Sequence, residues 1–301
     1  MTEDISDARA ALAAIQAFAA YSDPVKRLGG LTNRVYHIGD ACLRLPGEGT
    51  EEYIDRANEA VAAREAAKAG VSPEVLHVDP KTGVMITRFI EGAATMSPDA
   101  FRSRKGSPAR AAVAFRQLHD SGAVFPFRFE LFSMIDDYLK ILSTKDVALP
   151  AGYHDVVREA ETVRSALAAQ PLPLAPCHCD PLCENFLDTG ERMWIVDWEY
   201  SGMNDPMWDL GDLSVEGGFD AAQDAEMLEA YFGGAPSAND HGRMVIYKAM
   251  CDLLWTLWGL IQLANNNPAD DFRAYADGRF ARCKALMATL DFARHLAAVR
   301  G

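Results

Sequence analysis

The sequence predicts an α+β fold with two lobes, a small strand-rich lobe followed by a larger, mainly helical one. Before about residue 90, short β-prone runs alternate with turns, whereas helical patterns dominate after Glu91-Gly92. The chain has 301 residues, 49% of them apolar, so it can bury one large core or two smaller ones. We therefore expect an N-terminal lobe over residues 1–90, a C-terminal lobe over residues 91–301, and a ligand-binding cleft between them.

The predicted N-terminal lobe contains a set of short strands and one interrupting helix. Its strands are expected over Asn33–Ile38, Ala41–Leu45, Val75–Val78 and Val84–Ile90. Alanine and charged residues indicate a helix over Arg56–Lys68, and Gly70 and Pro73 follow where its C-terminus is expected. Residues 1–20 are rich in alanine, which predicts a further helix that packs on this lobe or on a partner chain, as in a homodimer.

The predicted C-terminal lobe is a series of helices broken by one hairpin. Helices are expected over Pro98–Asp120, Phe129–Leu142, His154–Ala169, Ala221–Phe232, His241–Asn265 and Pro268–Val299. Two short apolar runs, Phe186-Leu187 and Trp194-Ile195-Val196, are separated by the polar segment Asp188-Thr189-Gly190-Glu191. This pattern predicts a β-hairpin in the middle of the helices.

Charge limits the classes of partner. The formal net charge of −14 repels nucleic acid and anionic membranes but favours small cations. The opening segment MTEDISDARA is acidic where a signal peptide would be basic, and the longest later apolar run, Leu253 to Ile261, is half a membrane span. We expect a cytoplasmic protein that binds no nucleic acid and does not insert into a membrane.

One nine-residue stretch, Cys177-His178-Cys179-Asp180-Pro181-Leu182-Cys183-Glu184-Asn185, holds three of the six cysteines. A zinc site needs four ligands, usually as two spaced pairs, and no second cluster of Cys or His lies nearby in the sequence. We interpret the cysteines as reduced, small apolar residues. A thiolate metal site remains as an alternative, which metal analysis of the purified protein would test.

The same stretch fits phosphoryl transfer better. It has the spacing H-x-D-x-x-x-x-N from His178, and Asp197 ends the apolar run that follows. In such a site Asp180 would accept or orient the proton of an attacking hydroxyl, while Asn185 and Asp197 would hold Mg²⁺. Either acid alone could also be a turn or helix-capping residue.

Longer segments resemble a known family. PCHCDPLCENFL and WIVDWEYSGMNDPMWDLGDLS are similar to the catalytic and metal-binding segments of the aminoglycoside phosphotransferase and choline kinase superfamily, and the chain is identified as a choline kinase-like member. The resemblance runs from about Leu28 to Cys283. It implies a protein-kinase-like bilobal fold with a small antiparallel sheet in the N-terminal lobe, ATP as co-substrate and Mg²⁺ as cofactor.

The resemblance also assigns a nucleotide-binding loop and strand. LGGLTNRVYHI resembles the loop that covers the phosphates, with Gly29, Gly30 and Asn33 allowing close backbone approach. ACLRLPG resembles the third strand, with Arg44 at the position where most kinases carry lysine, and Glu59 matches the partner of that cation. Without the resemblance, an exposed strand residue and a solvated helix face are the alternative explanation of this pair.

The segment between the lobes is assigned in the same way. ITRFIEG resembles the family's interlobe linker, so backbone groups of Arg88, Phe89 and Ile90 would bond the adenine.

The C-terminal segment LLWTLWGLIQLANNNPADDFRAYADGRFARC bears on the acceptor. Trp255 and Trp258 lie three residues apart on one helix face, and Tyr275 follows in the next helix. Core packing is the ordinary explanation, but the spacing resembles the choline kinase C-terminus, which implies that these rings line a choline pocket. Ring faces hold a quaternary ammonium by cation–π contacts of about 0.5–2 kcal/mol each.

Carboxylates would complete that pocket. Asp180, Glu199 and Glu216 could supply a negative field for the cation. The stretch Glu216-Gly217-Gly218-Phe219 departs from the family pattern, because an aromatic-rich segment is expected there.

The sequence thus predicts an ATP- and Mg²⁺-dependent kinase of a small cationic alcohol, with choline as the first candidate. Ethanolamine, thiamine and aminoglycosides are alternative acceptors, because a few methyl groups against an aromatic wall discriminate by only about 1–3 kcal/mol. An alternative of another class is a kinase-like protein that binds such a ligand without turnover.

Overall fold

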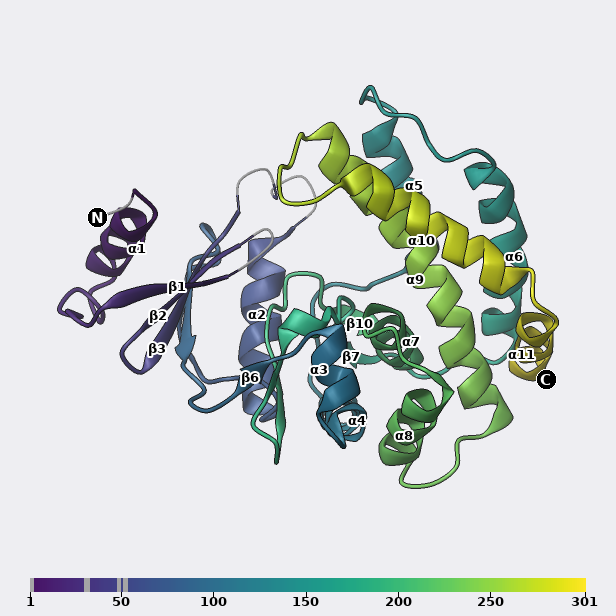
Figure 1. Cartoon of the computed structure of the whole chain (residues 1–301), viewed down its shortest axis with the longest axis horizontal. Coiled ribbons are helices and arrows are strands. Elements are labelled where there is room, and N and C mark those ends of the chain that lie inside the picture. The colour runs from purple at the N-terminus through teal and green to yellow at the C-terminus, as the bar shows by residue number, and fades with distance from the viewer. Residues whose placement is uncertain (1–2, 30–32, 48–49, 51–53) are drawn as a thin grey trace.

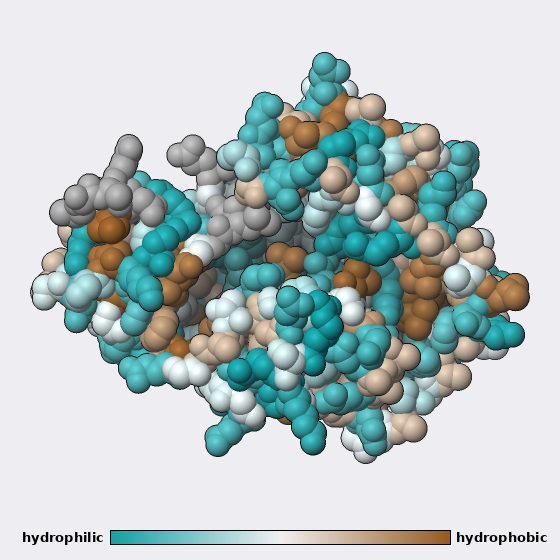
Figure 2. Space-filling model, viewed as in Figure 1, coloured by the Kyte–Doolittle hydropathy of each residue, from teal (hydrophilic) through white to brown (hydrophobic). Residues whose placement is uncertain are grey.

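Two lobes of unequal size form the structure, a computed structural model that describes residues 3–29, 33–47, 50 and 54–301. The small lobe carries a β-sheet and the large lobe is mainly helical (Figure 1). Between the lobes the surface is hollowed (Figure 2). The predicted α+β bilobal fold, with a small antiparallel sheet followed by a larger helical lobe, is confirmed by this arrangement.

An antiparallel sheet forms the small lobe. Its strands are β1 (Val25–Gly29), β2 (Arg34–Ile38), β3 (Ala41–Leu45), β4 (Val75–Val78) and β5 (Met85–Arg88), in the spatial order β1-β2-β3-β5-β4. The sequence analysis did not predict β1. The helix predicted within residues 1–20 is α1 (Glu3–Ala14).

Alternation along β3 separates the core of the small lobe from the cleft. Leu43 and Leu45 are buried in a cluster that also contains Ala8 and Leu12 of α1. Because successive strand side chains point to opposite faces, Arg44 lies on the other face of the sheet. The strand pattern therefore directs this arginine toward α2 and the large lobe.

Helix α2 (Arg56–Lys68) begins and ends as its sequence predicts. The side chain of Asp55 caps the helix by accepting hydrogen bonds from the backbone of Ala57 and Asn58. Gly70 follows the C-terminus with φ +76°, a conformation that favours glycine. The buried alanines of α2 belong to the same core cluster as the large lobe, so α2 connects the two lobes.

The large lobe contains α3 (Pro98–Ser103), α4 (Ser107–His119), α5 (Leu131–Leu142), α6 (Tyr153–Ala169), α7 (Met207–Glu216), α8 (Ala221–Phe232), α9 (Ala238–Ala264), α10 (Phe272–Met287) and α11 (Leu290–Arg300). The prediction of one helix over Pro98–Asp120 was wrong, because Gly106, with φ +76°, separates α3 from α4. The prediction of one helix over Pro268–Val299 was wrong as well. Thr289 caps a new helix there by accepting a hydrogen bond from the backbone of Phe292.

Helix α9 is the central helix of the large lobe (Figure 1). Gly259 lets it approach α10 closely, since a Cβ there would lie 2.6 Å from the Tyr275 ring. The length and composition of α9 would allow it to cross a membrane, but 89% of its most apolar 18-residue stretch is buried inside the protein. The core helix of a soluble protein passes the same test, so α9 is weak evidence for a membrane span.

Short strands hold the segment between α6 and α7. β7 (Ala175–Cys177) pairs with β10 (Gly202–Asn204), and the 3₁₀ turn η1 (Cys183–Asn185) leads into β8 (Phe186–Asp188). The predicted hairpin is present, because β8 pairs with β9 (Met193–Ile195), and β6 (Ala94–Thr95) adds a third strand. The two ends of the segment 177–202 are therefore adjacent, because Cys177 pairs with Gly202.

Candidate active site

Asp180 lies in the loop between β7 and η1. Pairing of Cys177 with Gly202 closes the base of this loop. The Asp180 side chain is half-buried, and its carboxylate accepts no hydrogen bond from the residues that the structure describes. Burial raises the pKa of Asp180 well above its ordinary value, and Asp212 and Glu216 raise it further. An unpaired carboxylate with this environment is suited to accept a proton.

Asn185 and Asp197 flank Asp180. The Asn185 side chain donates a hydrogen bond from Nδ2 to the backbone oxygen of Asp180 at 3.0 Å. The backbone oxygen of Asn185 accepts a bond from the N–H of Val196 at 2.9 Å, which places Asp197 next to the loop. Asp197 has φ +68°, a strained conformation for a residue other than glycine. The structure thus brings the three predicted catalytic residues together.

His178, the first residue of the motif, has a structural role. It is fully buried, its Nε2 lies 2.9 Å from the backbone oxygen of Val196, and its ring contacts Trp198 edge-on. Burial lowers the pKa of His178, which favours the neutral ring. His178 therefore ties the loop to the segment after β9 that carries Asp197.

A cluster of charged side chains bridges the lobes beside Asp197. Arg44 of β3 forms ion pairs with Glu59 of α2 and, at 3.0 Å, with Asp197. Burial alone would lower the pKa of Arg44, but Glu59 and Asp197 raise it. The predicted Arg44–Glu59 pair is present, and Arg44 and Glu59 are buried rather than exposed.

Glu199 belongs to the same cluster. Its Oε2 accepts hydrogen bonds from Asn33 Nδ2 at 3.2 Å and from Arg56 NH1 at 3.1 Å. Burial raises the pKa of Glu199 to about 7, with a further increase from Asp197, whereas Arg44 lowers it. Glu199 was expected in the acceptor pocket, but its hydrogen bonds are to Asn33 and Arg56 of the small lobe.

Three carboxylates of this cluster could hold a metal ion. One oxygen each from Glu59, Asp197 and Glu199 lie within 4.8 Å of one another. Carboxylate oxygens are the ligands that Mg²⁺ prefers, so the donor set fits that ion. Arg56 was not singled out from the sequence, although its position three residues before Glu59 on one helix was a usable signal.

The other predicted nucleotide-binding residues lie at the end of β1 and in the linker between the lobes. Gly29 ends β1, where an added Cβ would meet no atom within 4 Å, and Gly30 lies outside the described residues. In the linker, the N–H of Arg88 donates to Glu74 and that of Phe89 to Asp40, while the Phe89 ring stacks on His37 at 3.7 Å. These two N–H groups therefore already have partners.

The predicted aromatic residues lie next to one another at the junction of α9 and α10. Trp258 contacts Tyr275 and Phe272 with ring centroids 5.7 and 5.6 Å apart. Trp255 contacts Tyr200 at 5.5 Å. Only 4% of Trp255 and 9% of Trp258 is exposed, so both rings also contribute to the core.

One further residue, Asp212, joins this aromatic group. Trp255 Nε1 donates a hydrogen bond to Asp212 Oδ2 at 3.1 Å. Asp212 is fully buried, and burial raises its pKa well above the ordinary value, as does Glu216. Asp212 was not predicted, although the quoted segment DLGDLS places it three residues after Asp209 on one helix.

Glu216 pairs with an arginine that the sequence analysis also missed. Arg279 of α10 is buried, forms an ion pair with Glu216 and donates from NH1 to Asp252 Oδ1 at 3.2 Å. Its guanidinium lies 4.5 Å from the centroid of the Tyr275 ring. Part of the predicted negative field is therefore neutralised inside the protein.

The three clustered cysteines do not form a thiolate metal site among the described residues. Cys177, but neither Cys179 nor Cys183, belongs to a group with metal-ligand spacing. Burial raises the pKa of the Cys177 and Cys179 thiols well above their ordinary value, which disfavours thiolates.

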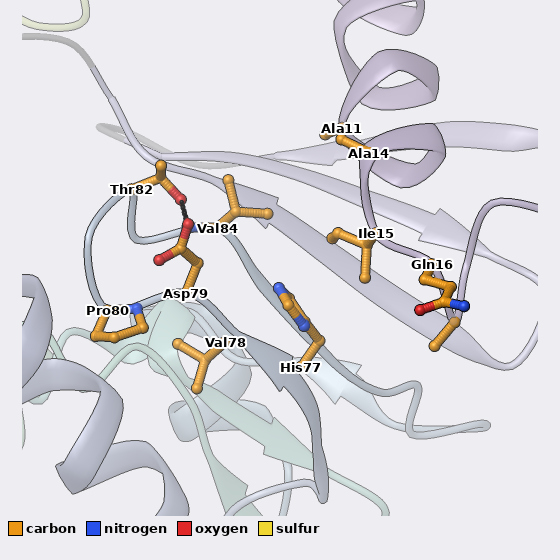
Figure 3. Close-up of a pocket in the computed structure, with 11 residues that line it drawn as sticks. Ala11, Ala14, Ile15, Gln16, His77, Val78, Asp79, Pro80, Thr82 and Val84 are labelled. Carbon is orange, nitrogen blue, oxygen red and sulfur yellow. Dashed lines mark hydrogen bonds between the residues drawn. The ribbon is translucent and has the colours of Figure 1, made fainter.

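A separate pocket of about 820 Å³ lies between α1 and the β4–β5 turn (Figure 3). Its walls include Ile15, His77, Pro80 and Val84, and none of the predicted catalytic residues. It is therefore distinct from the site around Asp180.

With this geometry, the fold and the site define a phosphotransferase, and comparison with known proteins agrees. Residues 25–246 match the family described as the phosphotransferase enzyme family, APH. Protein LicA of Haemophilus influenzae is 27% identical over 262 residues, 84% of this chain and 77% of LicA. Ethanolamine kinase 1 of Mus musculus is 24% identical over 306 residues, 83% of this chain and 80% of that kinase.

Solved structures extend the comparison. A choline/ethanolamine kinase family protein from Mesorhizobium loti superposes with a TM-score of 0.92, is 76% identical and covers 99% of both chains. Choline kinase LicA from Streptococcus pneumoniae has a TM-score of 0.79 at 24% identity, covering 95% of this chain and 99% of its own. LicA in complex with AMP has a TM-score of 0.75 at 24% identity, covering 97% and 98%.

The chain therefore belongs to the phosphotransferase enzyme family and to the choline/ethanolamine kinase family. The predicted resemblance and the prediction of a phosphotransferase with an alcohol group as acceptor are confirmed.

Proposed function

We propose that the protein transfers the terminal phosphoryl group of ATP, with Mg²⁺, to the hydroxyl of a small cationic alcohol, and that this alcohol is choline. The observation that carries the proposal is the Asp180 carboxylate. It is half-buried, has no hydrogen-bond partner among the described residues, and lies near other carboxylates that raise its pKa.

Asp180 would act as the base. A carboxylate whose pKa is raised binds a proton more readily near neutral pH, which suits a group that accepts the hydroxyl proton during transfer. Asn185 supports this role because its side chain fixes the backbone of Asp180. The expected rate enhancement comes from holding the hydroxyl in line with the phosphoryl group and from charge stabilisation.

The interlobe cluster would bind the nucleotide and the metal. Asp197 and Asn185 would hold Mg²⁺, with Glu59 and Glu199 as further oxygen ligands, and the ion would supply charge neutralisation between the terminal phosphates. Arg44 would move its guanidinium from Asp197 to phosphate oxygens. The LicA complex with AMP supports nucleotide binding in this fold, and Gly29, Gly30 and Asn33 would cover the phosphates.

The aromatic group would bind the cationic end of the acceptor. Trp255, Trp258 and Tyr275 offer ring faces, and Asp180 and Asp212 offer carboxyl groups that are not among the ion-pair partners of Arg279. This combination supports a quaternary ammonium.

Ethanolamine is the second candidate, on the basis of Asp212. The Trp255 indole donates to this buried carboxylate. A carboxylate has about four acceptor positions, so Asp212 could also accept N–H groups from a primary ammonium, which choline lacks. Ethanolamine kinases among the relatives are consistent with this alternative.

The test is ADP release from Mg-ATP with choline, ethanolamine, thiamine and an aminoglycoside as acceptors. Selective turnover of choline, lost in Asp180→Asn and kept in Glu184→Gln, is the expected result. Glu184 is an exposed carboxylate in the same loop and serves as the matched control. Equal turnover without any acceptor, or an active Asp180→Asn enzyme, would contradict the proposal.

Four expectations remain predictions: the lobe boundary at residue 90, a cytoplasmic location, no insertion into a membrane, and a homodimer. Sedimentation of the purified protein would test the homodimer.

A further inference from the structure

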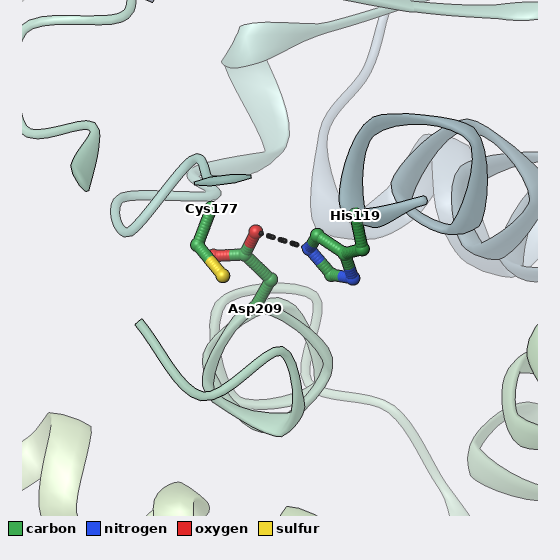
Figure 4. Close-up of side chains that lie close together, drawn as sticks. All are labelled: His119, Cys177 and Asp209. Atoms are coloured by element: carbon green, nitrogen blue, oxygen red, sulfur yellow. Dashed lines mark hydrogen bonds and ion pairs between the residues drawn. The ribbon is translucent and has the colours of Figure 1, made fainter. Parts of the chain in front are cut away.

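A chain of buried hydrogen bonds from α4, α7 and α8 supports the catalytic loop, the segment 178–185 that carries Asp180 and Asn185. Asp209 of α7 is fully buried, and its Oδ1 accepts the backbone N–H of Cys179 at 2.8 Å. Its Oδ2 accepts the backbone N–H of His178 at 2.8 Å and lies 3.0 Å from His119 Nε2 (Figure 4). One carboxylate therefore fixes the backbone N–H groups of the two residues that precede Asp180.

His119, the last residue of α4, orients that carboxylate. Its Nδ1 lies 2.8 Å from the hydroxyl of Tyr231 in α8. The Nε2–H group faces the Asp209 carboxylate, which can only accept, and Nδ1 pairs with the Tyr231 hydroxyl. The His119 ring is also held at 5.7 Å from the nearly parallel ring of Phe115. Helices α4, α7 and α8 thus meet at this imidazole.

This cluster has ligand atoms close enough for a metal ion, but its hydrogen bonds argue against one. His119, Cys177 and Asp209 offer one atom each within 4.8 Å of one another. Both nitrogens of His119 and both oxygens of Asp209 already have partners, and the Cys177 thiol donates to the backbone of Asn204. We therefore interpret it as a positioning network.

The loop needs such support because its backbone is strained. Cys179 has φ +68°, in the left-handed region where a side chain costs about 1–2 kcal/mol. Its buried N–H would be unpaired if Asp209 turned away, which costs about 1–3 kcal/mol more. Cys179 directly precedes Asp180, so a rotation of this peptide moves the carboxylate that would face the substrate hydroxyl.

From this network we infer that His119 is a positioning residue for Asp180, acting through Asp209 and the backbone of Cys179. The inference rests on the proposed function, in which Asp180 is the base. His119 contacts neither substrate nor nucleotide in this role, so its loss should lower kcat and leave both KM values nearly unchanged.

The experiment compares His119→Leu with His119→Gln in steady-state ADP release. Leucine removes the N–H that Asp209 accepts, and we expect kcat to fall about 10- to 100-fold, as for the loss of one hydrogen bond to a charged group. Glutamine can still donate from Nε2, so its kcat should stay within about 5-fold of the wild type. Equal loss in both variants, or a change confined to KM, would overturn the inference.

Two further variants separate positioning from packing. Leu118→Ala loosens the same core without removing a polar group, so it should lower the melting temperature with little change in kcat. Tyr231→Phe keeps His119 but removes its outer partner, and we expect a decrease of about 2- to 5-fold in kcat. Tyr231→Phe tests the hydrogen-bond network even if His119→Leu does not fold. An unchanged kcat in Tyr231→Phe would count against the inference.

Amide hydrogen exchange distinguishes this inference from the proposed function. We expect faster exchange in the peptide 177–185 of His119→Leu than in His119→Gln, whether or not any acceptor is turned over. Equal exchange would refute the positioning role alone. An active Asp180→Asn enzyme with the expected exchange pattern would refute the proposed base and leave the loop network intact.

Discussion

Replacement of Glu199 by glutamine tests the charge balance of the interlobe cluster. Burial, reinforced by Asp197, raises the pKa of Glu199 from 4.5 to about 7, against the opposing effect of Arg44. Because the folded pKa lies above the unfolded one, the unfolded chain ionises first as the pH rises. The free energy of unfolding should therefore fall between about pH 4.5 and pH 7, and glutamine removes this contribution.

The magnitude follows from the two pKa values. A shift from 4.5 to about 7 corresponds to about 3 kcal/mol between the protonation states. The Glu199 side chain is only 6% exposed, so solvent screens this energy little. About 2 kcal/mol of the change falls between pH 5.5 and pH 8. Over this interval the wild type should lose that much stability relative to the variant, on top of the constant offset that loss of the Arg56 ion pair produces at every pH.

Urea unfolding of metal-free protein, followed by tryptophan fluorescence at several pH values, measures this difference. Glu184→Gln, an exposed carboxylate in the catalytic loop, is the control. Its curve should run parallel to that of the wild type. If the Glu199→Gln curve is parallel as well, the inferred pKa and the energetic argument are wrong.

Three other substitutions test separate parts of the molecule. Asp180→Asn should abolish ADP release and raise the urea midpoint at neutral pH, because burial raises the pKa of Asp180 and its ionisation destabilises the fold; a lower midpoint would contradict this sign. Trp258→Ala should raise the acceptor KM more than it lowers kcat in steady-state kinetics, and an unchanged KM would mean that this ring serves only the core. Asp188→Asn should lose about 2 kcal/mol of stability at pH 7 in urea unfolding, because hydrogen bonds from Arg110 and Arg104 outweigh the effect of burial and lower the pKa of Asp188 to about 2. This stabilisation is present above about pH 4 and is lost as the pH falls toward 2. Equal stability of the variant and the wild type at pH 7 would refute it.

The catalytic loop could be predicted because its information is local. Asp180 and Asn185 lie five residues apart, and the hairpin returns the chain so that Asp197 lies beside them. The turn residues of that hairpin, including Gly190 with φ +89°, are visible in the sequence. Motif spacing and turn chemistry were therefore sufficient for this part of the site.

The charged partners could not be predicted in the same way. Arg56 contacts Glu199 across 143 residues, and Arg279 contacts Glu216 across 63 residues. Such pairs depend on how the two lobes and helices α7 and α10 pack, which side-chain periodicity does not specify. The helix boundary at Gly106 is different, because Gly-Ser-Pro is a recognised start signal that the continuous helical pattern concealed.

The interlobe cluster allows the proposed nucleotide to bind without leaving a buried charge unpaired. In this structure Arg44 forms ion pairs with Glu59 and Asp197, and Arg56 forms ion pairs with Glu59 and Glu199. Removal of one member of a buried ion pair is strongly destabilising, whereas exchange of one partner for another of the same sign is not. If Arg44 turns to phosphate oxygens, a divalent cation that enters with ATP can take its place at Asp197. ATP without the metal would draw Arg44 away and leave Asp197 without a cationic partner. Arg44 should therefore favour binding of the metal–nucleotide complex over binding of the free nucleotide.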